Sequence, residues 1–377
     1  MENSISCIIC IADMNIVPAL DQVLTELELP EVFIQRCKQT FLQDKRDFLG
    51  LRPVVKLDES RALIYRMYVP AEYEESVMRR IIDATDLVMG GRGSIFSQHI
   101  GILRGTPLVF NIEKLDRLCE KKERLFSEEH ALIACTVSRG AGDALAQAIL
   151  ELGIGVPVVF FGTGAGLRDR LGLLRVTIPI EKEIIWFLVS SSDADLVEKS
   201  IIPRANLDVP GNGFLYRCFV HAPVVNLRIR HGERAHAATM EQVIAALDEV
   251  QGSNDWRRFG SRKHEHKSGE KKSVNNRGLF FIGNEADIDL FRKEAIENGA
   301  RGATFNPVEM RSYRALTHGK AMESNSRQLC DIITTPETEE KIRSAAIKKG
   351  LFNEGKTCVL KTFNVEMPSI VHKKNRA

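Results

Sequence analysis

The sequence lacks several features that would assign it to a common functional class. No apolar stretch approaches the roughly 18 residues of a membrane-spanning helix. The 377 residues carry a net charge of only +2 and contain 7% aromatic residues, too little for a protein that holds nucleic acid with a basic face and stacking rings. It has no Ser-His-Asp order, no metal-ligand spacing and no context of an activated nucleophile. These absences argue against a membrane protein, a nucleic-acid-binding protein and a metalloenzyme.

Cysteine is present but forms no framework of spacings. The eight cysteines lie mainly within apolar stretches, which indicates reduced, buried thiols and a cytoplasmic protein. Cys7 and Cys10 form a CxxC pattern, but residues three apart on a strand point to opposite faces, so we expect packing rather than a disulfide or chelation. The first eleven residues lack a basic region and contain Ser4 and Ser6, so we expect no signal peptide.

What the sequence does contain is a repeat. Between Ala131 and Arg230 an apolar strand is followed by a helix, two strands, a second helix and a last strand, the βαββαβ order of ferredoxin-like domains. Residues 46–51 (RDFLGL) correspond to residues 168–173 (RDRLGL), and a glycine turn precedes the last strand as Gly91-Arg92-Gly93 or Gly211-Asn212-Gly213. An internal repeat of this kind predicts several small domains in one chain.

A third, more diverged copy begins at Gly278. Thr335 as N-cap, Pro336 at the first helical position and Gly350 beyond the end predict its second helix. We therefore predict an α+β chain of three tandem ferredoxin-like βαββαβ domains. The predicted parts are a first domain at 1–111, a helical linker at 112–129, a second domain at 130–232, an amphipathic helix with a basic tether at 233–277, and a third domain at 278–377.

The basic tether has two interpretations. Its Lys and Arg residues without apolar periodicity indicate a solvated connection. The alternative is a basic patch for an acidic partner or an anionic membrane surface. The tether includes His264 and His266, but two histidines in such a run do not predict a specific metal site.

Two motifs resemble active sites but fail on context. Residues 350–357 match GxxxxGK[ST], yet a P-loop follows a strand and opens a helix, whereas here a helix (337–349) precedes and a strand (358–363) follows. Asp47 and Asp169 could act as bases, but each adjoins an arginine in a repeated turn, which favours structural ion pairing. We predict that the chain is not an enzyme.

The order of features in the middle copy, about 130–232, resembles the P-II nitrogen-regulatory signalling family. In that family a Gly-Asp-Gly-Lys turn and a later Arg-Ile-Arg-Thr-Gly-Glu segment flank an adenine-nucleotide cleft, and a Gly-x-Gly forms the base of the T-loop. The matching segments here are Gly211-Asn212-Gly213-Phe214, 228–233 (RIRHGE) and Gly162-Thr163-Gly164. The two outer copies resemble the family weakly.

The resemblance implies a site that surrounds phosphates. Glycines let backbone amides approach an anion, and two arginines on alternate positions of one strand can clamp phosphates. The expected ligand is a small anionic effector, an adenine nucleotide, bound without a metal. The residues expected to contact it are Gly162, Gly164, Gly211, Gly213, Arg228, Arg230 and, at the turn of the third copy, Lys356.

The sequence also departs from the family. Phe214 replaces the lysine of the turn and Ala165 replaces the basic residue after the Gly-x-Gly, so a smaller or less charged ligand than a triphosphate fits better. About twenty residues separate Gly164 from the strand at Ile184, too few for the long T-loop with its modified tyrosine. We therefore expect no control by uridylylation.

P-II-like proteins are trimers with clefts between neighbours, so three tandem copies imply a covalent pseudotrimer that is monomeric as a whole chain. The expected function is regulatory: the effector orders the loop at 163–170, and a partner protein, a membrane transporter or an enzyme, responds. The alternative is a non-catalytic pseudotrimeric scaffold with degenerate clefts that binds its partner through 235–277. RNA binding on the sheets is a third, weaker interpretation.

Overall fold

The structure is a computed structural model, and it describes residues 5–46, 53–121, 130–166, 181–209, 211–228, 230–231, 275–314 and 324–367. The predicted helix at 235–250, nearly all of the tether with its two histidines, and Asp47 and Asp169 lie outside these residues. The elements, in chain order, are β1 (Ile5–Asp13), α1 (Val17–Glu26), β2 (Val32–Arg46), β3 (Pro53–Pro70), a 3-10 turn (Ala71–Tyr73), α2 (Glu74–Thr85), β4 (Gly93–His99), β5 (Gly101–Arg104), α3 (Ile112–Leu118), β6 (His130–Ser138), α4 (Gly142–Glu151), β7 (Val158–Gly166), β8 (Glu181–Ser190), α5 (Ala194–Arg204), β9 (Gly213–Val224), β10 (Arg230–His231), β11 (Asn275–Gly283), α8 (Glu285–Glu297), β12 (Gly302–Arg311), β13 (Ser324–Thr334), α9 (Pro336–Lys348) and β14 (Val359–Glu366).

These elements form a mixed α/β molecule around one large, mainly antiparallel sheet. The order strand, helix, two strands, helix, strand occurs in a first segment (β1 to β4), a second segment (β6 to β9) and a third segment (β11 to β14). Neighbouring strands run β4-β1-β3-β2 in the first, β9-β6-β8-β7 in the second and β14-β11-β13-β12 in the third. Each segment therefore places its first and third strands in the middle and its second and fourth at the edges.

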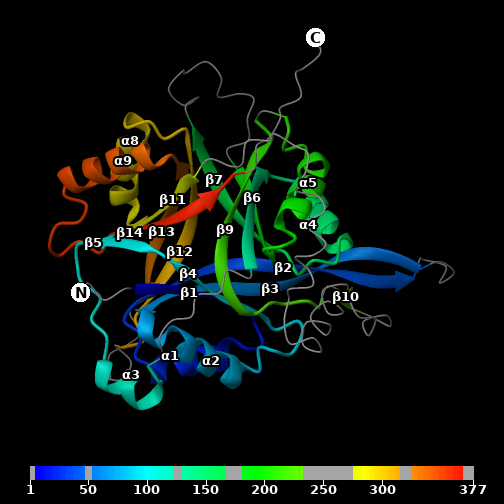
Figure 1. Cartoon of the computed structure of the whole chain (residues 1–377), viewed down its shortest axis with the longest axis horizontal. Helices are drawn as coiled ribbons and strands as arrows, with labels where there is room; N and C mark the ends of the chain where they lie inside the picture. Colours follow the sequence, from blue (N-terminus) through cyan, green and yellow to red (C-terminus); the bar gives the residue numbers. More distant parts are fainter. Residues whose placement is uncertain are drawn as a thin grey trace, which may run out of the picture.

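Each segment packs two helices against one face of its own strands, and the opposite faces share one core. The helix pairs α1/α2, α4/α5 and α8/α9 lie on the outside of the molecule (Figure 1). Apolar side chains from all three segments meet in the central cluster, among them Ile9, Trp186 and Phe280. Along β1 the strand alternates, so Cys7 faces the central cluster and Cys10 faces the helices. The expectation that these thiols point to opposite faces is confirmed, and all eight cysteines are free.

The second strands of the three segments pair in a cycle. The later part of each strand lies antiparallel to an earlier part of the next strand. The pairs are 38–39 of β2 with 158–159 of β7, 163–166 of β7 with 302–305 of β12, and 309–311 of β12 with 32–34 of β2. The cycle closes after three steps, as head-to-tail contacts do when they are related by rotation.

The fourth strands form a second cycle. Ile95 and Ser97 of β4 pair with β9, and Arg217 of β9 pairs with Glu366 of β14. The start of β14 in turn pairs with β5, which continues the chain directly beyond β4. In this second cycle, the chain that ends the first segment pairs with the third segment, and the strand that ends the second segment pairs with the first. Sequence patterns did not predict β5.

Local signals in the sequence explain several element ends. The Thr335 side chain accepts a hydrogen bond from the backbone N–H of Thr338, Pro336 follows it, and Gly350 beyond α9 has φ +73°. This confirms the predicted second helix of the third copy. β2 and β3 form a long hairpin that extends beyond the body of the molecule (Figure 1).

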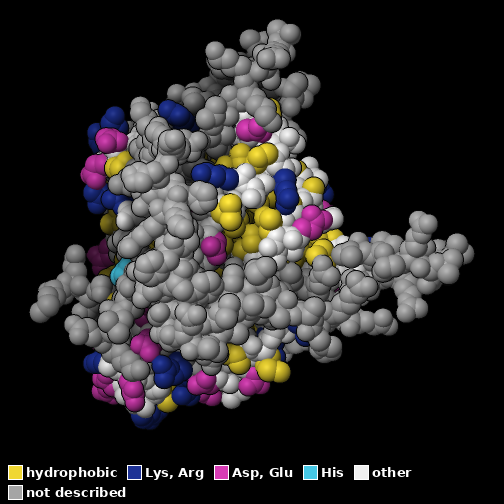
Figure 2. Space-filling view, turned by 45° about the vertical axis from the view of Figure 1, so that its right-hand side comes forward, with side chains coloured by type: hydrophobic (Ala, Val, Ile, Leu, Met, Phe, Trp, Pro, Cys, Tyr) yellow, Lys and Arg dark blue, Asp and Glu magenta, His cyan; other side chains and the backbone are white. Residues whose placement is uncertain are grey.

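The described helices include none that is long and apolar enough to cross a membrane. On the described part of the face in Figure 2, basic and acidic side chains are interspersed and hydrophobic side chains gather near the centre.

Candidate functional site

The glycine turns before β4 and β9 have the same backbone shape. Gly91 and Gly93 have φ of +94° and +139°, and Gly211 and Gly213 have φ of +96° and +157°. A Cβ on Gly93 would lie 1.8 Å from the carbonyl oxygen of Ile11, and one on Gly213 would lie 2.1 Å from that of Thr136. The second glycine of each turn is therefore required for the close approach to the first strand of its segment.

The turn of the first segment is contacted by the chain that leaves the second segment, at a place we call the first junction. The backbone N–H of Gly91 donates to Asn226 Oδ1 at 3.0 Å, and the N–H of Arg228 donates to the same oxygen at 3.2 Å. Asn226 is buried, and its Nδ2 donates to Gln39 Oε1 at 2.9 Å. The exposed Arg228 side chain donates through Nη1 to the carbonyl oxygen of Gly90 at 3.3 Å. Two backbone N–H groups from different segments thus converge on one oxygen beside an exposed guanidinium.

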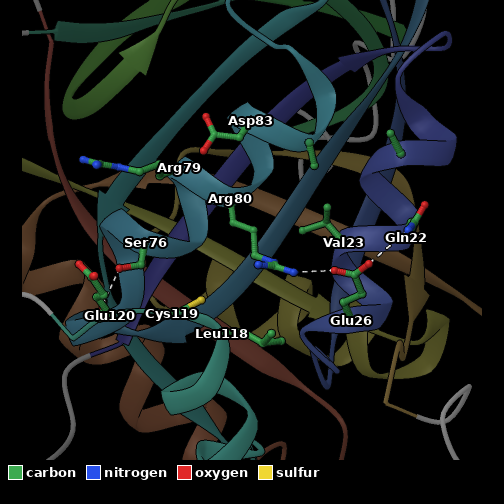
Figure 3. A pocket seen from close by; sticks show the side chains of 12 residues that line it. Gln22, Val23, Glu26, Ser76, Arg79, Arg80, Asp83, Leu118, Cys119 and Glu120 are labelled. Carbon is green, nitrogen blue, oxygen red and sulfur yellow. Dashed lines mark hydrogen bonds and ion pairs between the residues drawn. The ribbon is translucent and has the colours of Figure 1, made fainter.

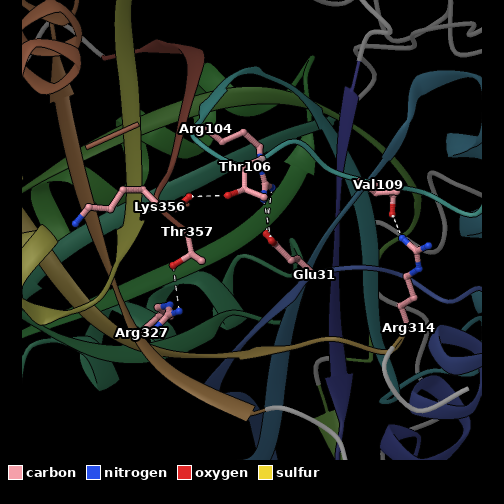
Figure 4. Close-up of polar contacts among 8 residues, drawn as sticks. All are labelled: Glu31, Arg104, Thr106, Val109, Arg314, Arg327, Lys356 and Thr357. Carbon is pink, nitrogen blue, oxygen red and sulfur yellow. Dashed lines mark hydrogen bonds and ion pairs between the residues drawn. The ribbon is translucent and has the colours of Figure 1, made fainter. Parts of the chain in front are cut away.

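The turn of the third segment is contacted by the chain that leaves the first segment, at the third junction. Thr106 Oγ1 donates to the carbonyl oxygen of Lys356 at 3.0 Å (Figure 4). A Cβ on Gly105 would lie 2.4 Å from the carbonyl oxygen of Asn353, so the two backbones touch. The strand that carries them ends at Arg104, which forms a two-pronged ion pair with Glu31 at 2.8 and 3.1 Å. This junction is filled by groups of the chain itself.

We call the place where β7 of the second segment pairs with β12 of the third segment the second junction. In the turn before β9, a Cβ on Gly211 would meet no described atom within 4 Å, so there is open space beside the first glycine of this turn. On β7, Gly164 pairs with Thr304 of β12, and a Cβ on Gly162 would lie 2.4 Å from Asn306 Oδ1. The continuation of the chain beyond 367, which follows β14, lies outside the described residues.

The seven residues expected to form one ligand site lie in several different places. Gly162 and Gly164 lie at the second junction, Gly211 and Gly213 in the turn before β9, Arg228 at the first junction, and Lys356 at the third. The Lys356 ammonium is paired with Asp287 at 2.8 Å, which raises the pKa of the lysine. Arg230 is in β10, where its backbone lies opposite Leu42 of β2. Arg228 is separated from the glycine turn of the second segment because the chain that leaves this segment crosses to the turn of the first segment.

The GxxxxGKT match is not a P-loop in its structural context. It begins beyond the end of α9 at Lys348, and the strand β14 starts after it at Val359. The order of helix and strand is opposite to the one that presents backbone amides and a helix N-terminus to phosphates. This interpretation of the motif is confirmed.

A pocket of about 710 Å³ lies between α1, α2 and the end of α3 (Figure 3). Arg80 points across it to Glu26, with an Nη2 to Oε2 distance of 2.7 Å, and this bond lowers the pKa of the Glu26 carboxyl. Cys119 also lines the pocket, and burial raises the pKa of its thiol. The pocket therefore combines an ion pair with a thiol whose raised pKa disfavours the reactive thiolate.

Metal ligands do not cluster in the described structure, where no group of three or more His, Cys, Asp or Glu side chains could hold an ion. Asn226 and Thr106, which complete two of the junctions, were not predicted from the sequence. Each is a polar residue shortly after a strand, and this pattern is too common in proteins to identify a contact between segments.

Comparisons with known proteins give limited likeness. No family model matches the sequence, and no curated protein matches it. The solved structure of a B. subtilis GlnK–ATP complex aligns at 13% identity with a TM-score of 0.22, covering 28% of this chain and 90% of the GlnK chain. A second structure of B. subtilis GlnK aligns at 14% identity with a TM-score of 0.22, covering 30% of this chain and 99% of the other.

Proposed function

We propose that this chain is a P-II-like regulatory protein whose three ferredoxin-like segments form an intramolecular pseudotrimer, and that it binds a small anionic effector at the first junction. The two closed cycles of strand pairing and the single core shared by all three segments support the pseudotrimer. Because the three interfaces are internal, the full chain is monomeric. The expected effector class is an adenine nucleotide.

The observation that carries the proposal is the convergence of Gly91 N–H and Arg228 N–H on one oxygen. Asn226 Oδ1 holds the position that an effector oxygen would take. The Arg228 guanidinium lies beside it, and among the described residues it makes one long hydrogen bond, to a neutral carbonyl. A phosphate offers that guanidinium a charge-assisted, two-pronged partner, which is a stronger interaction.

The first junction is connected to the projecting hairpin. Two residues after Arg228, Arg230 pairs in parallel with Leu42 of β2, and β2 continues into the hairpin with β3. An effector that fixes Arg228 favours the state in which β10 is docked on this hairpin, which is a shift between populations. A partner enzyme or membrane transporter would recognise the docked hairpin. No catalytic step is required of this protein.

Thermal unfolding of the full chain with ATP, ADP or AMP, each with and without magnesium, tests the proposal. A ligand at a hundredfold excess over its Kd stabilises the folded state by about 2.7 kcal/mol. We expect one nucleotide to raise the melting temperature, and Arg228→Gln to abolish the rise. The matched control is Arg79→Gln on the outer face of α2, where the arginine pairs with Glu75, and it should respond as the unmodified chain does.

A second candidate function is a scaffold with closed clefts. It is favoured by the fact that Asn226 Oδ1 and the Thr106 hydroxyl already occupy the first and third turns. A chain that unfolds cooperatively but responds to no nucleotide would favour the scaffold. A response that survives in Arg228→Gln would instead place the effector at another junction.

A further inference from the structure

Two cations are buried at the centre of the molecule. Arg66 on β3 is 1% exposed, and its guanidinium carbon lies 5.1 Å from the centre of the Trp186 ring on β8. Lys361 on β14 is fully buried, and its Nζ lies 4.7 Å from the centre of the Phe280 ring on β11. Trp186 and Phe280 both belong to the central cluster. Side chains from all three segments therefore surround two positive charges in one core.

The protein itself does not match these charges. Arg66 donates through Nη2 to Gln35 Oε1 at 2.8 Å, but its Nε and Nη1 have no partner in the described structure. Lys361 donates to Cys7 Sγ at 3.6 Å, and a thiol is a weak acceptor. Removing one partner of a buried ion pair costs roughly 3 to 5 kcal/mol, which shows how unfavourable an uncompensated buried cation is.

The nearby carboxylate belongs to Asp331 on β13, where it lies across the strands from Phe280. Its Oδ2 accepts a long hydrogen bond from Tyr216 at 3.4 Å, and its Oδ1 has no partner among the described residues. Neither of its oxygens is thus bonded to Arg66 or Lys361. Burial lowers the pKa of Lys361 and raises that of Asp331. Whether these two side chains are both ionised or both neutral, the Arg66 guanidinium leaves one positive charge in excess.

The same core is rich in unused donors. Tyr68 lies opposite Cys7 across the pairing of β1 and β3, and its buried hydroxyl has no partner among the described residues. The same holds for Trp186 Nε1 and for Gln35 Nε2, the amide nitrogen of the side chain that accepts from Arg66. An unpaired buried donor costs about 1 to 3 kcal/mol, so something that accepts hydrogen bonds is expected here.

We propose that this core holds one small monovalent anion of halide size, next to Arg66 and Lys361. Water alone would bring as many donors as acceptors to a place where donors already exceed acceptors, and it would leave the excess charge in place. An anion accepts from several donors and neutralises that charge. The anion stabilises the assembled chain and lies apart from the first junction, where the proposed effector binds.

Crystals of the unmodified chain grown with sodium bromide test the proposal directly. We expect an anomalous bromine peak within hydrogen-bond distance of Arg66 Nε or Nη1. Bromide peaks confined to the molecular surface, with waters filling this core, would overturn the proposal.

Solution measurements give a second test. When sodium bromide replaces sodium gluconate in the low millimolar range at constant ionic strength, the melting temperature should rise with the logarithm of bromide concentration. Arg66→Met should lose this slope. Arg80→Gln, which removes an arginine paired with Glu26 far from the core, should keep it. Equal slopes in all three proteins, or no slope in the unmodified one, would contradict the proposal, and the second outcome does not depend on whether a variant folds.

Discussion

Arg66 and Trp186 come from the third strands of different segments, and their side chains stack at the centre of the molecule at 5.1 Å. Arg66 lies opposite Ile9 on the first strand of its segment, and Trp186 lies opposite Ala134 on the first strand of the second. In the third segment Asp331 lies opposite Phe280 in the same way. A trimer of identical chains would place three equal charges at such a position, whereas a fused chain can place a cation, an indole and a carboxylate there. The three segments are therefore not interchangeable.

The two glycines of the second turn should differ sharply in their tolerance of alanine. Gly213→Ala places a Cβ 2.1 Å from the Thr136 carbonyl oxygen, whereas Gly211→Ala meets no atom within 4 Å, although both have positive φ. We expect Gly211→Ala to lower the free energy of unfolding by about 1 kcal/mol, from backbone strain. Gly213→Ala should cost about 3 kcal/mol or more, because a backbone atom must move. Urea denaturation of both variants measures the difference, and equal losses would show that the turn relaxes freely.

Asn226→Ala should destabilise the chain by at least about 2 kcal/mol, because it leaves the N–H groups of Gly91 and Arg228 without their acceptor. Asn212→Ala is the matched control. Asn212 is exposed, and within the described part of the chain its side chain donates one hydrogen bond, to the Asn206 carbonyl oxygen, so we expect a loss of about 0.5 kcal/mol. Chemical denaturation of the two variants compares these values. A small effect of Asn226→Ala would mean that water replaces the side chain and that the first junction is open to solvent.

Much of the local structure could be predicted from the sequence. Strand alternation, the cap at Thr335 and the positive-φ glycines act between residues close in the chain, and they placed most of the helices and strands. The junctions could not be predicted, because Arg228 meets Gly90, 138 positions earlier, and no local spacing specifies which turn the chain crosses to. The buried cations did leave a signal. Arg66 interrupts the apolar run 63–69 (LIYRMYV), in a strand that is buried on both faces.

Arg217 should be important for the contact between the second and third segments. It pairs with Glu366 of β14 at 2.8 Å, and it lies 3.6 Å from the buried carboxylate of Glu198. We expect Arg217→Met to destabilise the chain by about 3 kcal/mol at pH 8, since the pairing with Glu366 is lost and Glu198 must either bury its charge without a partner or take up a proton. Adding Glu198→Gln to this variant should recover part of the loss, which a double-mutant cycle in urea would measure. Additive losses would show that the two side chains do not interact.

The stability of the chain should fall as pH rises from about 4 to 7. Burial raises the pKa of Asp331 from 3.8 to about 7, so between these values the folded state holds a proton that the unfolded state has lost. A folded state that binds more protons loses stability as pH rises, by up to about 1.4 kcal/mol per pH unit. Burial also raises the pKa of Glu198 to about 7, with the same sign.

Denaturation at pH 5 and pH 8 measures this dependence. Asp331→Asn should remove part of the decline between the two pH values, and Asp331→Asn combined with Glu198→Gln should remove most of it. Because Asn cannot ionise, the free energy of unfolding of Asp331→Asn should fall less between pH 5 and pH 8 than that of the unmodified chain. A decline of unchanged size in the double variant would mean that both carboxyls are ionised in the folded state at pH 5. Their charges would then be matched inside the core, and for Asp331 the groups able to do this are Arg66 and Lys361.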